Sequence, residues 1–313
     1  MTKVRHFYYP SSDKLTQIHA MEWKPEGEPR AVVQLIHGMQ EFIDRYDDFA
    51  HFLCENGFLV VGNDHLGHGK SIVSEEKFGY FAEKNANRCV LTDLRALHRS
   101  VEDKYPALPY FILGHSMGSF LARQYICLYG EYLDGAVISG TAWHPAAETL
   151  AGKLLCRVLA SRKGWYYRSA FMTNLAMGSY NKKLAPVRTK HDWLTRDESI
   201  VDAYRKDRRT QFMFTLNGFY MLFDSLDYLT RKENLKRMPK DLPVLFIAGE
   251  MDPVGAYGSG VKKTVACFRN SGMKNVQCRL YPNDRHEVLN ELNRQEVYQD
   301  VLHFLEKNLG TES

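Results

Sequence analysis

The sequence has few cysteines for its length and no long apolar run. Six cysteines are spread over 313 residues with no C-x-x-C pair. This spacing gives no disulfide framework and no cysteine-based metal site, so we expect reduced thiols. No stretch of about 18 apolar residues occurs, which argues against a transmembrane helix. The first ten residues contain no apolar segment of signal-peptide length. We therefore expect a soluble, cytoplasmic protein.

Charge is close to balanced, and this argues against a nucleic-acid partner. The chain has 41 Lys and Arg against 37 Asp and Glu, a net charge of +4, and no arginine-rich arm. Hydrophobic residues make up 44% and charged residues 25%, as in ordinary globular proteins. No internal repeat is visible. The length suits one large domain with an insertion.

Short apolar runs alternate with longer amphipathic segments, an order typical of βαβ units around a parallel sheet. Val4–Tyr9 and Leu15–Trp23 predict a leading hairpin. Continuous apolar runs fit strands that are covered on both faces. The expected central strands are Ala31–Ile36, Leu59–Asn63, Tyr110–Leu113, Ala136–Ser139, Val244–Ala248 and Val276–Tyr281. The expected helices are Tyr46–Asn56, Arg88–Lys104, Ser119–Tyr129, Gly258–Asn270 and Glu287–Asn308. The predicted class is α/β, with a mostly parallel sheet and helices on both faces.

The alternation stops between residues 141 and 240. This segment is rich in aromatic residues and has 19 basic against 9 acidic side chains, whereas the rest of the chain has 22 against 28. We interpret it as a mainly helical cap over the carboxyl edge of the sheet, where open α/β sheets bind ligands. Residues 1–140 and 241–313 then form the core. The basic charge indicates either solvated helix faces or attraction of anionic and amphipathic substrates, including transient contact with a membrane or micelle.

The most informative segment is Gly114-His115-Ser116-Met117-Gly118, a G-x-S-x-G between an apolar strand and a helical pattern. In this context the motif predicts a nucleophile elbow, a turn so tight that only small residues fit two positions before and after the serine. The serine then lies near the positive end of the following helix. We therefore predict Ser116 as a nucleophile.

A serine hydroxyl needs a base, and the base needs an orienting acid. In this fold the acid follows a later strand and the histidine follows the last one. Asp252 stands in the turn after an apolar strand, with Glu250 as a local alternative, and His286 stands between the last strand and the final helix. His286-Glu287 begins an H-E-x-x-H zinc motif, but residue 290 is Asn, so no metal is implied. No cofactor is implied either.

The oxyanion hole is made by backbone amides and is therefore assigned by position. One donor should be the N–H of Met117, directly after the nucleophile. The second should come from the turn after the Ala31–Ile36 strand. We assign it to Met39, because Gly38 leaves the backbone free to aim the next amide inward.

Together these residues resemble the monoacylglycerol lipase and lysophospholipase branch of the α/β-hydrolases, the serine-aminopeptidase-like group. The resemblance runs from about residue 31 to residue 308. The motifs that carry it are His37-Gly-Met-x-Glu41 with Arg45-Tyr46, Asp64-His-Leu-Gly-His-Gly-Lys-Ser71, Gly114-His-Ser-Met-Gly-Ser119, Asp252-Pro-Val and Arg285-His286-Glu287. The resemblance implies an oxyanion donor, a structural loop, the nucleophile, the acid and the base, in that order. Phe42 stands where members often have His, and Leu66 where many have Arg.

These features predict a serine hydrolase that cleaves carboxylic esters through an acyl-enzyme. Monoacylglycerols or lysophospholipids are the expected substrates. Short-chain or aryl esters, or amides and peptides, are the alternatives on the same fold. Two further hypotheses are a non-catalytic binding protein, which such folds also support, and a module that docks on membranes. The oligomeric state is not predicted.

Overall fold

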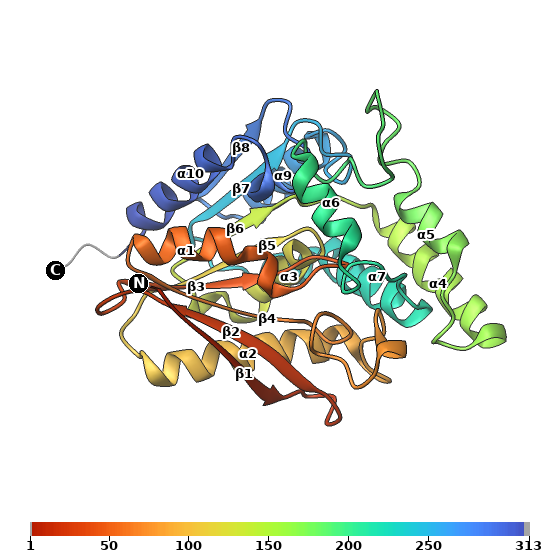
Figure 1. Ribbon diagram of the computed structural model, residues 1–313, viewed down its shortest axis with the longest axis horizontal. Coiled ribbons are helices and arrows are strands. Elements are labelled where there is room, and N and C mark those ends of the chain that lie inside the picture. Colours follow the sequence, from red (N-terminus) through yellow and green to blue (C-terminus); the bar gives the residue numbers. More distant parts are fainter. Residues whose placement is uncertain (1, 310–313) are drawn as a thin grey trace.

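The computed structural model describes residues 2–309, and an eight-stranded sheet runs through it (Figure 1). The strand order is β1-β2-β4-β3-β5-β6-β7-β8. β1 and β2 form an antiparallel hairpin, β2 pairs antiparallel with β4, and every other neighbouring pair is parallel. The strands are β1 Lys3–Pro10, β2 Gln17–Lys24, β3 Ala31–Ile36, β4 Phe58–Asn63, β5 Tyr110–His115, β6 Gly135–Ser139, β7 Val244–Gly249 and β8 Val276–Tyr281.

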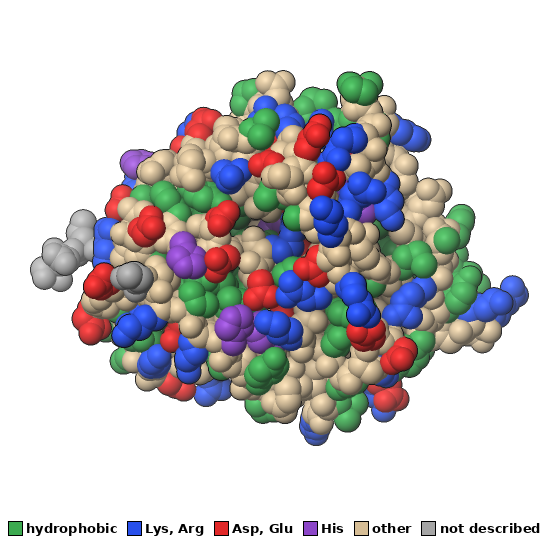
Figure 2. Space-filling view, in the orientation of Figure 1, with side chains coloured by type: hydrophobic (Ala, Val, Ile, Leu, Met, Phe, Trp, Pro, Cys, Tyr) green, Lys and Arg blue, Asp and Glu red, His purple; other side chains and the backbone are tan. Residues whose placement is uncertain are grey.

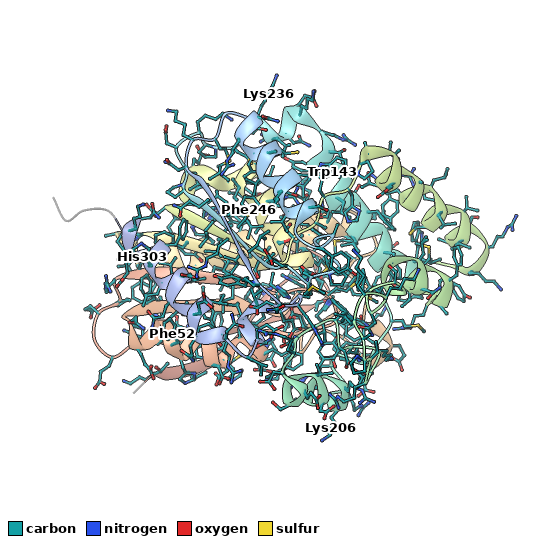
Figure 3. The ribbon with its side chains drawn as sticks, turned by 90° about the horizontal axis from the view of Figure 1, so that it is seen from above. Phe52, Trp143, Lys206, Lys236, Phe246 and His303 are labelled. Carbon is teal, nitrogen blue, oxygen red and sulfur yellow. The ribbon has the colours of Figure 1, made fainter. Side chains whose placement is uncertain are left out.

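Helices cover both faces of the sheet because its strands are apolar on both sides. On β3, Val32 and Ile36 belong to the core on one face, and Val33 and Leu35 to the core on the other. α2, α3 and α9 pack on the first face, and α1 and α10 on the second. These helices are α1 Asp47–Glu55, α2 Ala86–Lys104, α3 Met117–Tyr129, α9 Ser259–Asn270 and α10 Arg294–Lys307. Phe246 of β7 points into the interior in Figure 3.

The segment between β6 and β7 is mainly helical and extends beyond one end of the sheet, on the right in Figure 1. Its helices are α4 Ala146–Lys163, α5 Ala170–Met177, α6 Glu198–Lys206, α7 Leu216–Thr230 and α8 Lys232–Leu235. α7 packs against α4 on one side and against α3 on the other, and its buried side chains join the core of the first face. The division into core and cap therefore stays a prediction. No helix among residues 2–309 has the length and apolar character needed to cross a bilayer.

Most predicted strands and helices are found within two residues of their expected bounds, but the last helix is not. It begins at Arg294 rather than Glu287, and residues 288–290 form a short 3₁₀ turn. The reason is long-range bonding. The N–H of Glu287 donates to Leu194 O, and the carbonyl of Asn290 accepts from Thr195 Oγ1. Both partners lie in the insertion, so the chain here is shaped by contacts from a distant segment.

Candidate active site

Ser116 lies at the turn between β5 and α3, where the backbone is forced out of its ordinary range. Its φ is 53° and its ψ is −121°, an uncommon conformation for a residue with a side chain. A Cβ on Gly114 would collide with the carbonyl of Gly118, and one on Gly118 would collide with the carbonyl of Ile36. Glycine at both positions lets β5, α3 and β3 approach closely enough to make the elbow.

Asp252 and His286, 34 residues apart, meet beside this turn. Asp252 lies in the turn after β7 and His286 in the loop after β8, and His286 Nδ1 is 3.0 Å from Asp252 Oδ1. Both side chains are buried, whereas Glu250, the local alternative, is exposed. Oδ1 of Asp252 also accepts the N–H of Val254 at 2.8 Å, so the carboxylate is held in place from a second side. Of the two carboxylates, Asp252 is the one that contacts the imidazole.

The Asp252 carboxylate keeps the imidazole of His286 basic. Burial alone would lower the pKa of His286, but the charge of Asp252 and its hydrogen bond outweigh burial and hold the pKa above its ordinary value. With Nδ1–H donating to Asp252, Nε2 is the ring atom left to accept a proton. Nε2 is buried and has no hydrogen-bond partner within residues 2–309.

The two predicted oxyanion donors lie next to Ser116 along the chain or in space. Met117 is the first residue of α3, so its N–H has no carbonyl one turn earlier within the helix. Met39 follows Gly38, and a Cβ placed on Gly38 would lie 2.9 Å from Cβ of Ser116. The Gly38 carbonyl accepts a 2.8 Å bond from Nδ1 of His37, whose Nε2 accepts the N–H of His65. The histidines of these loops are therefore structural hydrogen-bonding groups.

The comparisons with known proteins decide the family. The model of the serine aminopeptidase S33 family matches residues 27–293. The chain belongs to this family of α/β-hydrolases. It is similar to monoglyceride lipase of Mus musculus, 28% identical over 293 residues that cover 87% of this chain and 84% of the mouse protein. It is also similar to monoacylglycerol lipase of Mycolicibacterium smegmatis, 28% identical over 92% of each chain.

A solved structure agrees with this membership of the S33 family. The carboxyl esterase of Bacillus coagulans matches with a TM-score of 0.91 and 27% identity, over 99% of this chain and 100% of the esterase. The predicted α/β-hydrolase fold and family are confirmed, and the chain is a serine hydrolase of that family. The roles of individual residues in this S33 hydrolase are proposals.

In this S33 hydrolase the insertion contacts His286, the candidate base, directly. The sequence did not predict this contact. The Trp193 ring lies 5.1 Å from the ring of His286, and Trp193 O accepts the His286 N–H at 3.3 Å. On another side lies His115 of the elbow, 4.7 Å from His286 between ring centroids. Burial first, and then the neighbouring His286, lower the pKa of His115 to about 3, so His115 is neutral and adds no charge to the site.

A cleft of about 1430 Å³ is lined largely by the insertion, and Ser116, Asp252, His286, Met39 and Met117 are not among its lining residues. Two lining residues adjoin the site: Gln40 follows Met39, and Trp193 contacts His286. The apolar lining residues include Ile72, Phe78, Met177, Phe212 and Met213. Arg168, Lys190, Lys206, Arg208 and Arg209 supply positive charge, and Glu75, Glu76 and Asp207 supply negative charge. Arg208 pairs with Glu75, and Arg209 pairs with Asp207. Lys206 points outward from the end of α6 in Figure 3. Among the described residues, no group of three or more histidine, cysteine or acidic side chains is arranged to hold a metal ion.

Proposed function

We propose that the protein hydrolyses carboxylic esters, with Ser116 as nucleophile, His286 as general base and Asp252 as the orienting acid. The observation that carries the proposal is the buried His286–Asp252 hydrogen bond beside a strained serine elbow, with Nε2 of His286 left without a partner. A nucleophile, a base and an orienting group within one site are the requirements of acyl transfer.

The reaction proceeds in two steps. Ser116 Oγ attacks the ester carbonyl while Nε2 of His286 takes its proton, and the amides of Met39 and Met117 donate to the oxyanion. His286 then protonates the leaving alcohol and an acyl-enzyme remains. Water, activated by the same histidine, repeats the attack and releases the acid. Asp252 holds the Nδ1–H tautomer and stabilises the imidazolium throughout.

The proposed substrates are acyl esters of glycerol or glycerophospholipids. The apolar wall of the cleft, with Phe78, Phe212 and Met213, suits an acyl chain, since burial of each CH₂ group is worth about 0.8 kcal/mol. The relatives named monoglyceride lipase and monoacylglycerol lipase support the same class. The cleft lining has five basic against three acidic side chains, and this surplus of positive charge favours amphipathic molecules with an anionic head group.

Short-chain or aryl ester hydrolysis is the second candidate function. The structural likeness to a carboxyl esterase over nearly the whole chain favours it. A panel of monoacylglycerols, lysophospholipids and p-nitrophenyl esters of increasing chain length separates the two. We expect kcat/KM to rise with chain length up to medium or long chains. A maximum at acetate or butyrate would instead assign the short-chain function, and activity on amides alone would overturn both.

We also propose that the insertion rests transiently on lipid surfaces. Leu150, Leu154 and Val158 form an exposed row on α4 at a spacing of four, and on α5 Phe171 and Leu175 each have 61% of the residue exposed. Figure 2 shows hydrophobic side chains beside Lys and Arg over this end of the molecule, at the right edge. Apolar side chains that enter a bilayer, flanked by cations that attract anionic lipids, are the features of an interfacial surface.

A further inference from the structure

Two carboxylates and one guanidinium are buried together behind the candidate site. Arg45 Nη1 lies 2.8 Å from Glu41 Oε2, and Arg45 forms two bonds with Glu287, of 2.8 and 2.7 Å. Only 4% of each carboxylate side chain and 11% of that of Arg45 are exposed. Ion pairs at such depth cost desolvation energy, and in some proteins they fix geometry rather than add stability.

Glu41 connects this cluster to the candidate oxyanion loop. Its Oε1 accepts the N–H of Gly38 and the hydroxyl of Tyr46, while Oε2 faces Arg45. The carbonyl of Gly38 is held by His37 Nδ1. Because a peptide unit is planar, the direction of the Gly38 carbonyl sets the direction of the Met39 N–H. Hydrogen bonds therefore hold both the N–H and the carbonyl of Gly38. These bonds set the direction of the Met39 N–H.

Glu287 connects the same cluster to the loop that carries the candidate base. It follows His286 directly, and its second oxygen also accepts a 2.9 Å bond from Asn290 Nδ2. The paired bonds from Arg45 fix the plane of the Glu287 carboxylate, which a single-point contact does not do. The Arg45 guanidinium also lies 5.0 Å above the ring of Tyr204, on α6 of the insertion.

We propose that Arg45 and Glu41 are positioning residues, which hold the Met39 amide and the His286 loop in one fixed relation across Ser116. This inference rests on the proposed function. Oxyanion stabilisation and proton transfer act on the same tetrahedral intermediate, so donor and base must keep their relative places to a fraction of an ångström. Arg45 is the only described side chain that bonds to both Glu41 and Glu287.

The charges of the cluster agree with this role. Burial would raise the pKa of Glu287, but Arg45 outweighs it and lowers that pKa to about 2, so Glu287 is ionised. Burial, only partly offset by Arg45, raises the pKa of Glu41 to about 7. Arg45 therefore holds Glu287 in its charged form and only partly offsets the burial of Glu41. The Gly38 N–H has an oxygen acceptor whether Glu41 is ionised or not.

Two substitutions distinguish the effect of the cluster's charge from the effect of the paired hydrogen bonds between Arg45 and Glu287. Glu41→Gln keeps an oxygen for Gly38 but turns an NH₂ group toward Arg45, where two donors oppose each other. Arg45→Lys keeps the charge and loses the paired bonds to Glu287. Arg45→Met removes both. Asp227→Asn is the matched control, because Asp227 pairs with Lys153 between α7 and α4 and has 5% of its side chain exposed.

The full-length variants are compared by kcat and KM on p-nitrophenyl butyrate and by the rate of fluorophosphonate labelling. The folded fraction is measured by circular dichroism. We expect kcat per folded molecule to fall about 10-fold in Glu41→Gln and about 100-fold or more in Arg45→Met, as for loss of an oxyanion donor. Arg45→Lys should lie between wild type and Arg45→Met. KM should stay within about twofold, because ground-state binding is untouched. Asp227→Asn should keep wild-type kcat.

A wild-type kcat in folded Glu41→Gln and Arg45→Lys would overturn the inference while the proposed function stands. The same holds if every loss of activity follows the folded fraction, as it would for a purely structural role. If Arg45→Met does not fold, the other two variants decide. If the wild-type protein neither hydrolyses an ester nor reacts with the fluorophosphonate, the proposed function fails, and the inference fails with it.

Discussion

The N–H of Glu287 lies 2.7 Å from the carbonyl oxygen of Leu194, in a segment about 90 residues earlier in the chain. The His286 N–H makes the neighbouring bond, to Trp193. The loop that carries the proposed base is therefore fixed to the insertion by main-chain bonds as well as to the core. A change in the backbone at Trp193 or Leu194 should therefore shift the position of His286.

Arg196 is the main ionic contact between these two segments. It bonds to Asp284 and Glu291, whose side chains are fully buried. Arg196→Met leaves two buried carboxylates without their cation, and we expect the free energy of unfolding to fall by about 3 kcal/mol. Urea unfolding measures this loss. The control is Arg205→Met, whose pair with Asp202 is largely exposed and should cost less than about 1 kcal/mol. Equal losses in the two variants would refute the expectation.

The pH dependence should follow His286. Its protonated form cannot accept the Ser116 proton, so kcat/KM falls as the pH falls through the pKa of His286. Because that pKa is raised, the midpoint of the acid limb should lie above the ordinary value of about 6.5. Asp252→Asn removes the charge that raises it, so the midpoint should move down while kcat falls about 10⁴-fold. A pH–rate profile that keeps its midpoint in Asp252→Asn would contradict the assignment of Asp252.

Gly118 should tolerate no side chain. A Cβ there would overlap the Ile36 carbonyl, which is backbone and cannot swing away. We expect Gly118→Ala to lose about 1–3 kcal/mol or more of unfolding free energy and to lose kcat, because the elbow must open. Gly27→Ala is the comparison. Gly27 has a positive φ, +84°, unlike Gly118, and nothing lies within 4 Å of its Cβ position. That variant should lose stability only and keep kcat. Full activity in Gly118→Ala would show that the elbow is looser than described.

The proposed lipid contact of the insertion is tested by a double substitution, Leu154→Gln with Phe171→Ser. Both side chains are more than 60% exposed, so the fold should tolerate the change. We expect weaker co-sedimentation with phosphatidylglycerol vesicles and unchanged kcat on a soluble ester. Val4→Gln, which alters an exposed valine on the edge strand β1, should leave sedimentation unchanged. Equal vesicle binding by the wild-type protein, the double variant and Val4→Gln would contradict the proposed contact.

The sheet was predictable because its signal is local. Buried strands such as β3 and β7 are continuous apolar runs, and the G-x-S-x-G motif carries its turn in five adjacent residues. β2 begins at Gln17 and not at Leu15, because Asp13 Oδ1 accepts the N–H groups of Leu15 and Thr16 and closes a turn there. Such small errors come from side chains that bond to nearby backbone.

The surroundings of the site were less predictable, because they depend on contacts between distant segments. Arg45 and Glu287 are 242 residues apart, and no periodicity in either segment indicates that they pair. Their presence in the family motifs was the only signal. Trp193 lies in a stretch without regular spacing, so its contact with His286 follows only from how the insertion folds over the sheet. The start of α10 was misjudged for the same reason.

The most direct test of the account is Ser116→Ala beside the wild-type protein. The change removes only Oγ and leaves the elbow glycines in place, so the thermal midpoint should not fall. We predict that hydrolysis of p-nitrophenyl butyrate and of a monoacylglycerol falls by at least about 10⁴-fold and that fluorophosphonate labelling disappears. Wild-type turnover by a folded Ser116→Ala protein would contradict the account at its centre.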